Sequence, residues 1–400
     1  MNDVIFSRNT AACLARSAER NSALRSFVTR SALTIGFMTA GAAAFAGAPK
    51  PNVDVTVTNA ATFSRAVEAA KSGDIIRLAP GTYGDLAVTG LNITTGTVRI
   101  TSLNTAQPAV VTSFLVDHSS GLAIDTLSIN AIKTTKTFPF TVANSNHIAL
   151  DNLTAVGDGY GPNPTAVSAI ILRDGTDLSL TRSRISSFWH GVTMLNITNA
   201  RIADNELRDL RTDGIRGGGV SNSIIEGNVE TNFHPIPIDH PDGIQLWTDG
   251  QKQSASNVII RYNLVDRGTG GATQGIFIRD VVGGLPFLNM QVYGNLVIGT
   301  RYNGIAIDGI VGGQVHDNQV VSYPDIESWL RIQNGSAVAL DRNVASKFPV
   351  LNATLISNTA NTILTSYLPS NAPALIKVWA SQPGPAQATA GNTLLKSIAP

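Results

Sequence analysis

A short segment with an asparagine at its centre recurs along this chain and restricts the folds that the chain can adopt. Each copy begins apolar-x-x-Asn and most continue with x-apolar, and the clearest copies place the asparagine at Asn205, Asn228, Asn263, Asn295, Asn318 and Asn343. Weaker copies carry Leu127, Asp151 and Ser183 at that place. Successive copies lie 22 to 35 residues apart, and most intervals fall between 22 and 25. A period of this length indicates a solenoid built from one repeated structural unit.

Alternation within each copy predicts strands with one buried face, and the period predicts one coil of a parallel β-helix per copy. We therefore expect an all-β fold, a single-stranded right-handed parallel β-helix solenoid. The asparagines suit a tight bend between two sheets, because Asn tolerates the left-handed backbone and its amide can bond to the amide of the next coil. A leucine-rich repeat would show Leu at fixed positions, which this chain lacks.

The two ends of the repeat region differ from its middle. Residues 62–70 have the pattern of a short amphipathic helix, and a Gly73-Asp74-Ile75-Ile76 segment follows. We expect this helix to cap the apolar N-terminal end of the stack, since a solenoid needs a terminal cap. The solenoid itself is expected over residues 48–349. From residue 350 to residue 400 the repeat fades into apolar fragments and Pro/Ala-rich sequence, which predicts a C-terminal cap and tail.

Residues 1–47 are expected to be a signal peptide with a long n-region. Arg25 and Arg30 precede an apolar run over residues 32–45 that is short for a membrane span, and small residues follow near a cleavage site at residues 46–48. The alternative is a buried helix. We expect a secreted or periplasmic protein with no membrane span in the mature chain. The only cysteine, Cys13, precedes the cleavage site, so thiol catalysis and cysteine-ligated metals are excluded from the mature chain.

Charge is sparse and balanced, with 14% charged residues and a formal net charge of +1. Nucleic-acid binding would demand a basic face, which this balance does not indicate. A few arginines in one groove are nevertheless enough to bind an acidic polymer. We expect a monomer.

A second column of polar residues follows the Asn bends, each member standing before a Gly-aliphatic pair. Its members are His190, Asp213, Asp242, Gln274 and Asn303. Strand alternation then places two further rows on the outer face, and a third row stands two residues before the column. These rows are Thr193, Arg216, Gln245, Phe277 and Ala306; Leu195, Gly218, Trp247, Arg279 and Asp308; and Phe188, Arg211, His240, Ala272 and Arg301. Because neighbouring strands lie about 4.8 Å apart, these side chains should form one compact patch.

The residue types in this patch suit a sugar polymer. Trp247 can stack on a sugar face, and Gln245, Gln274 and Asn303 can bond to hydroxyl groups. Arginines such as Arg211 can form paired hydrogen bonds with uronate carboxylates. We therefore expect an extracellular or cell-surface polysaccharide as the partner. The segment 232–242 is a loop insertion beside the patch, and long loops on a rigid scaffold often carry function.

The repeats, the Gly-Asp-x-Ile segment and the stretch Asp239-His240-Pro241-Asp242-Gly243-Ile244-Gln245 resemble β-helix carbohydrate-active proteins, including alginate lyases and mannuronan C5-epimerases. The opening coil looks like that of pectate-lyase-like β-helices, and the resemblance covers roughly residues 55–345. The epimerases carry Asp-Pro-His before an acidic residue, whereas His and Pro are exchanged here. Residues 211–214 partly match the Asn-Thr-Asp-Gly motif of polygalacturonase-type hydrolases, but their other motifs are absent.

Three functions remain open on this evidence. A uronate lyase or epimerase would use His240 as the base and Arg216 or Arg279 to neutralise the sugar carboxylate, beside Asp213 and Asp242. A glycoside hydrolase would instead use Asp213 and Asp242 as its catalytic pair. The third function is binding without catalysis. A purely structural role is the alternative for each of these residues. Asp is favoured at turns before Gly, and His240 could serve to pack its loop. No cofactor is certain, although Asp239 and Asp242 with His240 are candidate Ca²⁺ ligands.

Overall fold

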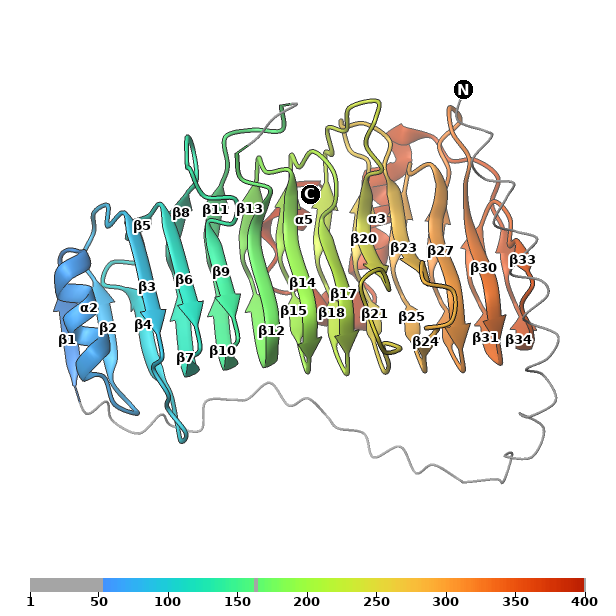
Figure 1. The fold of residues 1–400 in the computed structure, drawn as a ribbon. Helices are drawn as coiled ribbons and strands as arrows, with labels where there is room; N and C mark the ends of the chain where they lie inside the picture. Colours follow the sequence, from blue (N-terminus) through green and yellow to red (C-terminus); the bar gives the residue numbers. More distant parts are fainter. Residues whose placement is uncertain (1–52, 162–164, 399–400) are drawn as a thin grey trace, which may run out of the picture. The chain divides into compact units, whose positions relative to one another are not determined.

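The chain folds into a stack of parallel coils, seen from the side in Figure 1. A computed structural model describes residues 53–161 and 165–398; the expected signal peptide and Cys13 lie outside the described residues. Each coil passes through three faces, called here the first, second and third face. The first and second faces together form a 24-stranded sheet and the third face forms an 11-stranded sheet. These parallel ladders confirm the predicted β-helix.

The first face contains β3 (Asp85–Thr89), β6 (Ser113–Asp117), β9 (Phe140–Ala143), the start of β12 (Ser168–Thr181), β14 (His190–Thr198), β17 (Ile215–Ser221), β20 (Asp242–Trp247), β23 (Gln274–Arg279), β24 (Phe287–Leu288), β27 (Tyr302–Val311), β30 (Ser328–Ser336) and β33 (Val350–Leu351).

The second face contains β1 (Asp54–Val57), β2 (Ile75–Leu78), β4 (Val98–Ser102), β7 (Ser120–Asp125), β10 (Asn146–Asp151), the end of β12, β15 (Arg201–Ala203), β18 (Ile224–Glu226), β21 (Ile259–Arg261), β25 (Gln291–Tyr293), β28 (Gln314–His316), β31 (Val338–Asp341) and β34 (Leu355–Thr359).

The third face contains β5 (Val110–Val111), β8 (Ser128–Asn130), β11 (Thr154–Val156), β13 (Arg184–Ser186), β16 (Glu206–Arg208), β19 (Val229–Thr231), β22 (Leu264–Asp266), β26 (Leu296–Ile298), β29 (Gln319–Val321), β32 (Val344–Ala345) and β35 (Thr362–Ile363). Helix α2 (Ala60–Ala69) precedes the stack, and η1 (Pro369–Asn371), α3 (Ala372–Ala380), α4 (Pro383–Ala388) and α5 (Thr393–Ile398) follow it.

The asparagine column forms a buried ladder between the second and third faces. Each Asn donates its backbone and side-chain N–H groups to the side-chain oxygen of the next Asn, as Asn228 does to Asn263 at 3.0 Å for both bonds. Asn361 extends the ladder by one coil, and the Ser183 backbone N–H donates to Asn205 at its other end. The predicted register was wrong at one place. Leu153, not Asp151, occupies the ladder position, because its backbone N–H bonds to the Ser183 hydroxyl.

The left-handed backbone lies one residue before each ladder asparagine rather than on it. These preceding positions have φ near +50° to +65° and carry Asp204, Gly227, Tyr262, Gly294, Asp317 and Arg342. Left-handed asparagines do occur, in an exposed row at the corner between the first and second faces. There Asn257 donates to Asn222 at 2.8 Å. The ladder Asn therefore serves through its amide hydrogen bonds and not through its backbone preference.

The core is a set of aliphatic columns inside the coils. On the first face, Ile215, Ile244, Ile276 and Ile305 are paired in register and are fully buried. The glycine before each of them leaves room for third-face side chains. A Cβ atom on Gly243, for example, would lie 2.7 Å from a Val265 methyl carbon. The Gly-aliphatic pairs thus follow from close packing between the first and third faces.

The two ends of the stack are covered differently. Helix α2 lies at the N-terminal end (Figure 1), where Phe63 is fully buried and its ring packs edge-on against Phe114 at 5.9 Å. Beyond residue 349, strands β33 to β35 continue the coils through Ile363. Helix α3 then packs on the outside of the third face, where Ile376 and Trp379 join Leu264 and Leu296 in a second apolar cluster. Within residues 53–161 and 165–398, no helix is both long and apolar enough to cross a membrane.

Candidate active site

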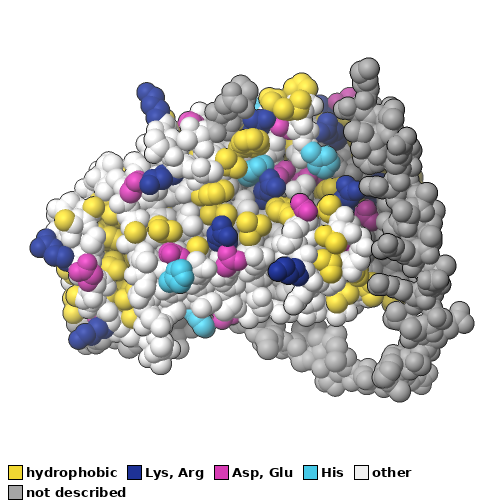
Figure 2. All heavy atoms as spheres, in the orientation of Figure 1, with side chains coloured by type: hydrophobic (Ala, Val, Ile, Leu, Met, Phe, Trp, Pro, Cys, Tyr) yellow, Lys and Arg dark blue, Asp and Glu magenta, His cyan; other side chains and the backbone are white. Residues whose placement is uncertain are grey.

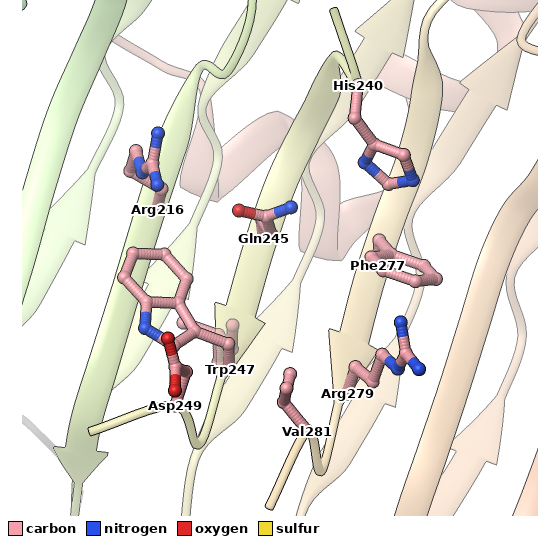
Figure 3. A pocket seen from close by; sticks show the side chains of 9 residues that line it. Arg216, His240, Gln245, Trp247, Asp249, Phe277, Arg279 and Val281 are labelled. Carbon is pink, nitrogen blue, oxygen red and sulfur yellow. The ribbon is translucent and has the colours of Figure 1, made fainter. Parts of the chain in front are cut away.

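An open groove of about 510 Å³ lies on the first face across β17, β20 and β23. Figure 3 shows Arg216, Gln245 and Phe277 side by side on three successive strands, with His240 at the entry to its strand. The complete lining consists of Arg216, His240, Gln245, Leu246, Trp247, Asp249, Phe277, Arg279 and Val281. Figure 2 shows basic, acidic and apolar side chains gathered over this part of the face.

The strand register creates the predicted outer rows. Arg216 pairs with Gln245 and Gln245 with Phe277, while Trp247 pairs with both Gly218 and Arg279. Five residues predicted as catalytic or sugar-binding therefore line one groove: Arg216, His240, Gln245, Trp247 and Arg279. Phe277, Asp249 and Val281 also line it, although the sequence did not single them out as site residues.

His240 stands at the centre of a hydrogen-bonded chain. Its Nδ1 lies 3.1 Å from an Asp242 carboxylate oxygen, and its Nε2 accepts a hydrogen bond from the Gln274 amide at 2.7 Å. The Asn303 amide in turn donates to the Gln274 oxygen. Since an amide nitrogen can only donate, this chain places the imidazole proton on Nδ1 and leaves the Nε2 lone pair as the acceptor. Gln274 and Asn303 thus orient the histidine.

The imidazole is 58% exposed, whereas the carboxylate behind it is fully buried. Its hydrogen bond to Asp242 raises the pKa of His240, and burial opposes this effect. One Asp242 oxygen accepts from His240 and from Gln245 at 2.6 Å, while the other has no hydrogen-bond partner among the described residues. Burial raises the pKa of Asp242, with the His240 hydrogen bond as the main opposing effect.

Asp213 lies beneath the groove rather than in it. It is 3% exposed, and its carboxylate accepts a hydrogen bond from the Asp242 backbone N–H at 3.1 Å and forms an ion pair with Arg216 at 2.9 Å. Burial, followed by the charge of Asp242, raises the pKa of Asp213 to about 7. Asp213 and Asp242 are therefore neighbours, as the column predicted, but neither presents its carboxylate to the groove.

Arg216 is held in place from three sides. Besides Asp213, it contacts Nε2 of the buried His190 at 2.8 Å, and its guanidinium carbon lies 4.8 Å from the centre of the Trp247 ring system. Burial, followed by the charges of Arg216 and Arg211, lowers the pKa of His190 to about 2, so this histidine is neutral and accepts from Arg216. Trp247 lies over Gly218, where an added Cβ would approach its Nε1 to 2.9 Å. The guanidinium group of Arg216 is therefore held in a fixed position at the edge of the groove.

Arg211 and Asp239 form a buried pair that holds the loop at residues 232–241. The guanidinium of Arg211 donates hydrogen bonds to both Asp239 carboxylate oxygens, at 2.7 and 2.9 Å, and Arg211 is only 2% exposed. This pairing directs the Asp239 carboxylate to Arg211 rather than to a site shared with Asp242. Among residues 53–161 and 165–398, no group of three His, Cys, Asp or Glu side chains is placed to hold a metal ion. The candidate Ca²⁺ ligands thus do not form a fitting site here.

Two further charged residues lie near the groove and were not predicted from the sequence. Glu230 is fully buried inside the coil, and its Oε2 lies 1.9 Å from where a Cβ on Gly214 would be. Arg331 occupies the outward row of β30, in register with Ala306. The sequence carried a signal for Glu230, because the copy at Asn228 lacks the apolar residue that follows the other asparagines by two positions.

Comparisons with known proteins place the fold. No curated protein matches the sequence. Among solved structures, an alginate lyase from Paenibacillus sp. str. FPU-7 aligns with a TM-score of 0.51 at 15% identity, covering 76% of this chain and 99% of that one. A GH136 lacto-N-biosidase from Eubacterium ramulus aligns with a TM-score of 0.50 at 10% identity, covering 78% of this chain and 68% of that one.

These structural likenesses, at such low identity, show the fold alone. The family model for the right handed beta helix region matches residues 141–366, which is more than half of the chain. This range includes the asparagine ladder, the groove and the third-face strands behind it. The chain therefore belongs to the right-handed β-helix family.

Proposed function

We propose that this protein is a secreted enzyme that removes the C5 proton of a uronate in an acidic polysaccharide, as a lyase or a C5-epimerase. The observation that carries the proposal is the half-exposed His240 imidazole in an open groove, backed by the buried Asp242 carboxylate. An Asp–His pair of this kind is suited to general base catalysis. An alginate lyase has the same fold.

In this reaction the C5–H bond of the uronate takes the place of the Gln274 amide as the partner of His240 Nε2. As the proton moves to Nε2, the ring becomes an imidazolium whose charge the Asp242 carboxylate stabilises. The Nδ1–H···Asp242 bond keeps the ring in the tautomer that the step requires.

The sugar carboxylate must be neutralised before its C5 proton can leave, because the negative charge spreads onto that carboxylate in the transition state. Arg216 suits this role, since Asp213, His190 and Trp247 fix its position. With the pKa of Asp213 raised to about 7 by burial and by Asp242, that carboxyl is partly protonated near neutral pH. Asp213 then neutralises Arg216 only in part, and the remaining positive charge of Arg216 can attract the sugar carboxylate.

The geometry favours proton abstraction over hydrolysis by Asp213 and Asp242. A hydrolase needs one carboxyl group within reach of the glycosidic oxygen and a second beside the sugar carbon or its attacking water. Asp213 and Asp242 are 3% and 0% exposed, so neither can contact a sugar in the groove without rearrangement. Binding without catalysis remains an outcome of the test.

The test is an assay of the purified protein on alginate, polygalacturonate and glycosaminoglycans. A lyase creates unsaturated uronate ends that absorb in the ultraviolet, and an epimerase changes the uronate ratio without that signal. We expect His240→Gln to lower the rate by about 10²–10⁴-fold. His147→Gln, at a 68% exposed histidine on the second face, is the matched control and should leave the rate unchanged. The rate should fall with decreasing pH as His240 is protonated, because its pKa is raised by Asp242.

Two results would contradict the proposal. New reducing ends without ultraviolet absorbance or a changed uronate ratio would indicate hydrolysis. Retained polysaccharide binding with no turnover in the wild type would indicate a binding protein.

A further inference from the structure

The outward rows of the first face continue past the groove toward the C-terminal coils. Phe277 is in register with Ala306, and Ala306 with Arg331. Ala306 points outward but is fully buried, which requires that larger neighbouring side chains close over it. The next row contains Arg279 and Asp308. Arg331 and Arg279 thus flank the same short stretch of surface.

Positive charge is undercompensated on this stretch. Arg279 lies 3.9 Å from Asp308, at the outer limit of an ion pair, and it is 48% exposed. The same aspartate accepts a hydrogen bond from Asn334 at 2.7 Å. The Nε of Arg331 is buried and has no hydrogen-bond partner among the described residues. Two guanidinium groups therefore share one carboxylate that is already engaged.

On the other side of the groove each arginine lies against its own carboxylate. Arg211 is paired in two hydrogen bonds with Asp239, and Arg216 is paired with Asp213 at 2.9 Å. The two arginines on the C-terminal side disfavour each other's charge. Burial lowers the pKa of Arg331, Asp308 raises it, and the nearby charge of Arg279 lowers it. Like charges held together at a groove are stabilised when an anion binds between them.

We propose that Arg279 and Arg331 bind the carboxylate of a second uronate, next to the one at His240 and on the side of the C-terminal coils. This inference rests on the proposed function for its substrate class. Strands β20 and β30 are three rungs apart, or about 14 Å at a rung spacing of about 4.8 Å. That length accommodates more than one sugar ring. The enzyme would therefore require consecutive acidic sugars.

The test measures binding of a mannuronate or galacturonate tetrasaccharide by calorimetry to full-length protein carrying His240→Gln, so that turnover does not interfere. Adding Arg331→Gln should weaken binding by about 10–100-fold, as expected for the loss of charge-assisted hydrogen bonds. Arg279→Gln should weaken it as well, and Arg331→Lys should restore part of the affinity. The matched control is Arg342→Gln, at a 55% exposed arginine paired with Asp317 away from the groove.

A second arm uses the same tetrasaccharide with its carboxylates reduced to alcohols. It should bind weakly to the parent protein, and Arg331→Gln should change its affinity little. Unchanged affinity of the acidic sugar in folded Arg331→Gln and Arg279→Gln proteins would overturn the inference. So would equal binding of the reduced sugar by the parent protein.

The two proposals can fail separately. If His240→Gln abolishes turnover while the arginine variants bind normally, the proposed function stands and the second carboxylate site does not. If no uronate polymer is turned over but binding of the acidic tetrasaccharide depends on Arg331, the site stands and the proposed reaction does not.

Discussion

Glu230 occupies a position inside the coil where the adjacent coils place aliphatic side chains. It is in register with Leu207 on one side and Val265 on the other. Neither of its carboxyl oxygens has a hydrogen-bond partner among the described residues. Burial, followed by the charge of Asp213, raises the pKa of Glu230 well above its usual value. The folded protein therefore holds a proton at Glu230 near neutral pH.

This proton makes stability depend on pH. Because the folded-state pKa is raised, the unfolded chain releases the Glu230 proton first, and the free energy of unfolding falls as pH rises above the unfolded-state value of about 4.3. We expect Glu230→Gln to reduce that fall between about pH 5 and pH 8. Glu230→Leu should raise stability by about 1–3 kcal/mol at neutral pH, because it removes a buried polar group without partners.

Denaturant unfolding at several pH values measures both effects. Glu68→Gln, on the exposed side of α2, is the control and should leave the pH dependence as it is. If Glu230→Gln retains the pH dependence of the wild type, Glu230 holds no proton in the folded protein near neutral pH.

At the residue scale, alternation along each strand predicted which side chains share the groove, because the ladder fixes the register of every coil. Burial of Asp213 and Asp242 could not be predicted, since it depends on how His190, Arg216, His240 and Gln245 pack around them. The Arg211–Asp239 pair likewise joins two segments 28 residues apart through side-chain reach rather than register.

At the element scale, each ladder asparagine links three coils. Asn263 accepts hydrogen bonds from Asn228, and it donates to Asn295 and to the Ile225 carbonyl oxygen, each at 3.0 Å. The residue is fully buried, so water cannot replace these bonds. Asn263→Leu should lower the free energy of unfolding by about 1–3 kcal/mol for each polar group left unpaired.

The matched control is Asn257→Gly in the exposed asparagine row, where glycine accepts the φ of +54° without strain. It should cost much less than Asn263→Leu in chemical denaturation. Equal losses for the two variants would show that the buried amides contribute no more than the exposed ones.

The period and the strands could be predicted because the asparagine recurs at a fixed place in each coil. The left-handed position before it could not, since Asp204, Tyr262 and Arg342 share no side-chain property. A left-handed backbone is set there by the bend and the ladder bonds on either side, which override the preference of the residue itself.

At the scale of the whole molecule, the part of the third face formed by β22 and β26 is largely apolar on its outside as well as its inside. Leu264, Leu296 and Ile298 flank inward residues such as Val265 and Val297, yet they are fully buried. The sequence contained this signal in consecutive apolar residues after the asparagines, which a strand with one solvated face would not need. Helices α3 to α5 supply the cover, and their place could not be predicted because the contacts join segments far apart in the chain.

Trp379 anchors this cover. It is 2% exposed, and its Nε1–H donates to the Gly294 carbonyl oxygen at 2.9 Å. Further along the chain, the Thr393 hydroxyl and the Leu394 backbone N–H donate to Glu206, at 2.7 and 3.0 Å. We expect Trp379→Ala to weaken docking of the helices by about 3–5 kcal/mol, the usual cost of removing a buried aromatic side chain. The apolar third face would then open to solvent.

Hydrogen exchange and binding of a hydrophobic dye test this directly. In Trp379→Ala, amides of residues 369–398 should exchange faster and dye binding should rise, while the coils from β14 to β30 stay protected. Val378→Ala, at a 62% exposed neighbour on the same helix, should change neither measurement. The groove lies on the first face, so any turnover of polysaccharide should persist in both variants. Unfolding of the whole stack in Trp379→Ala would contradict this prediction. It would mean that the coils need the helices on the third face for their stability, so that both unfold as one cooperative unit.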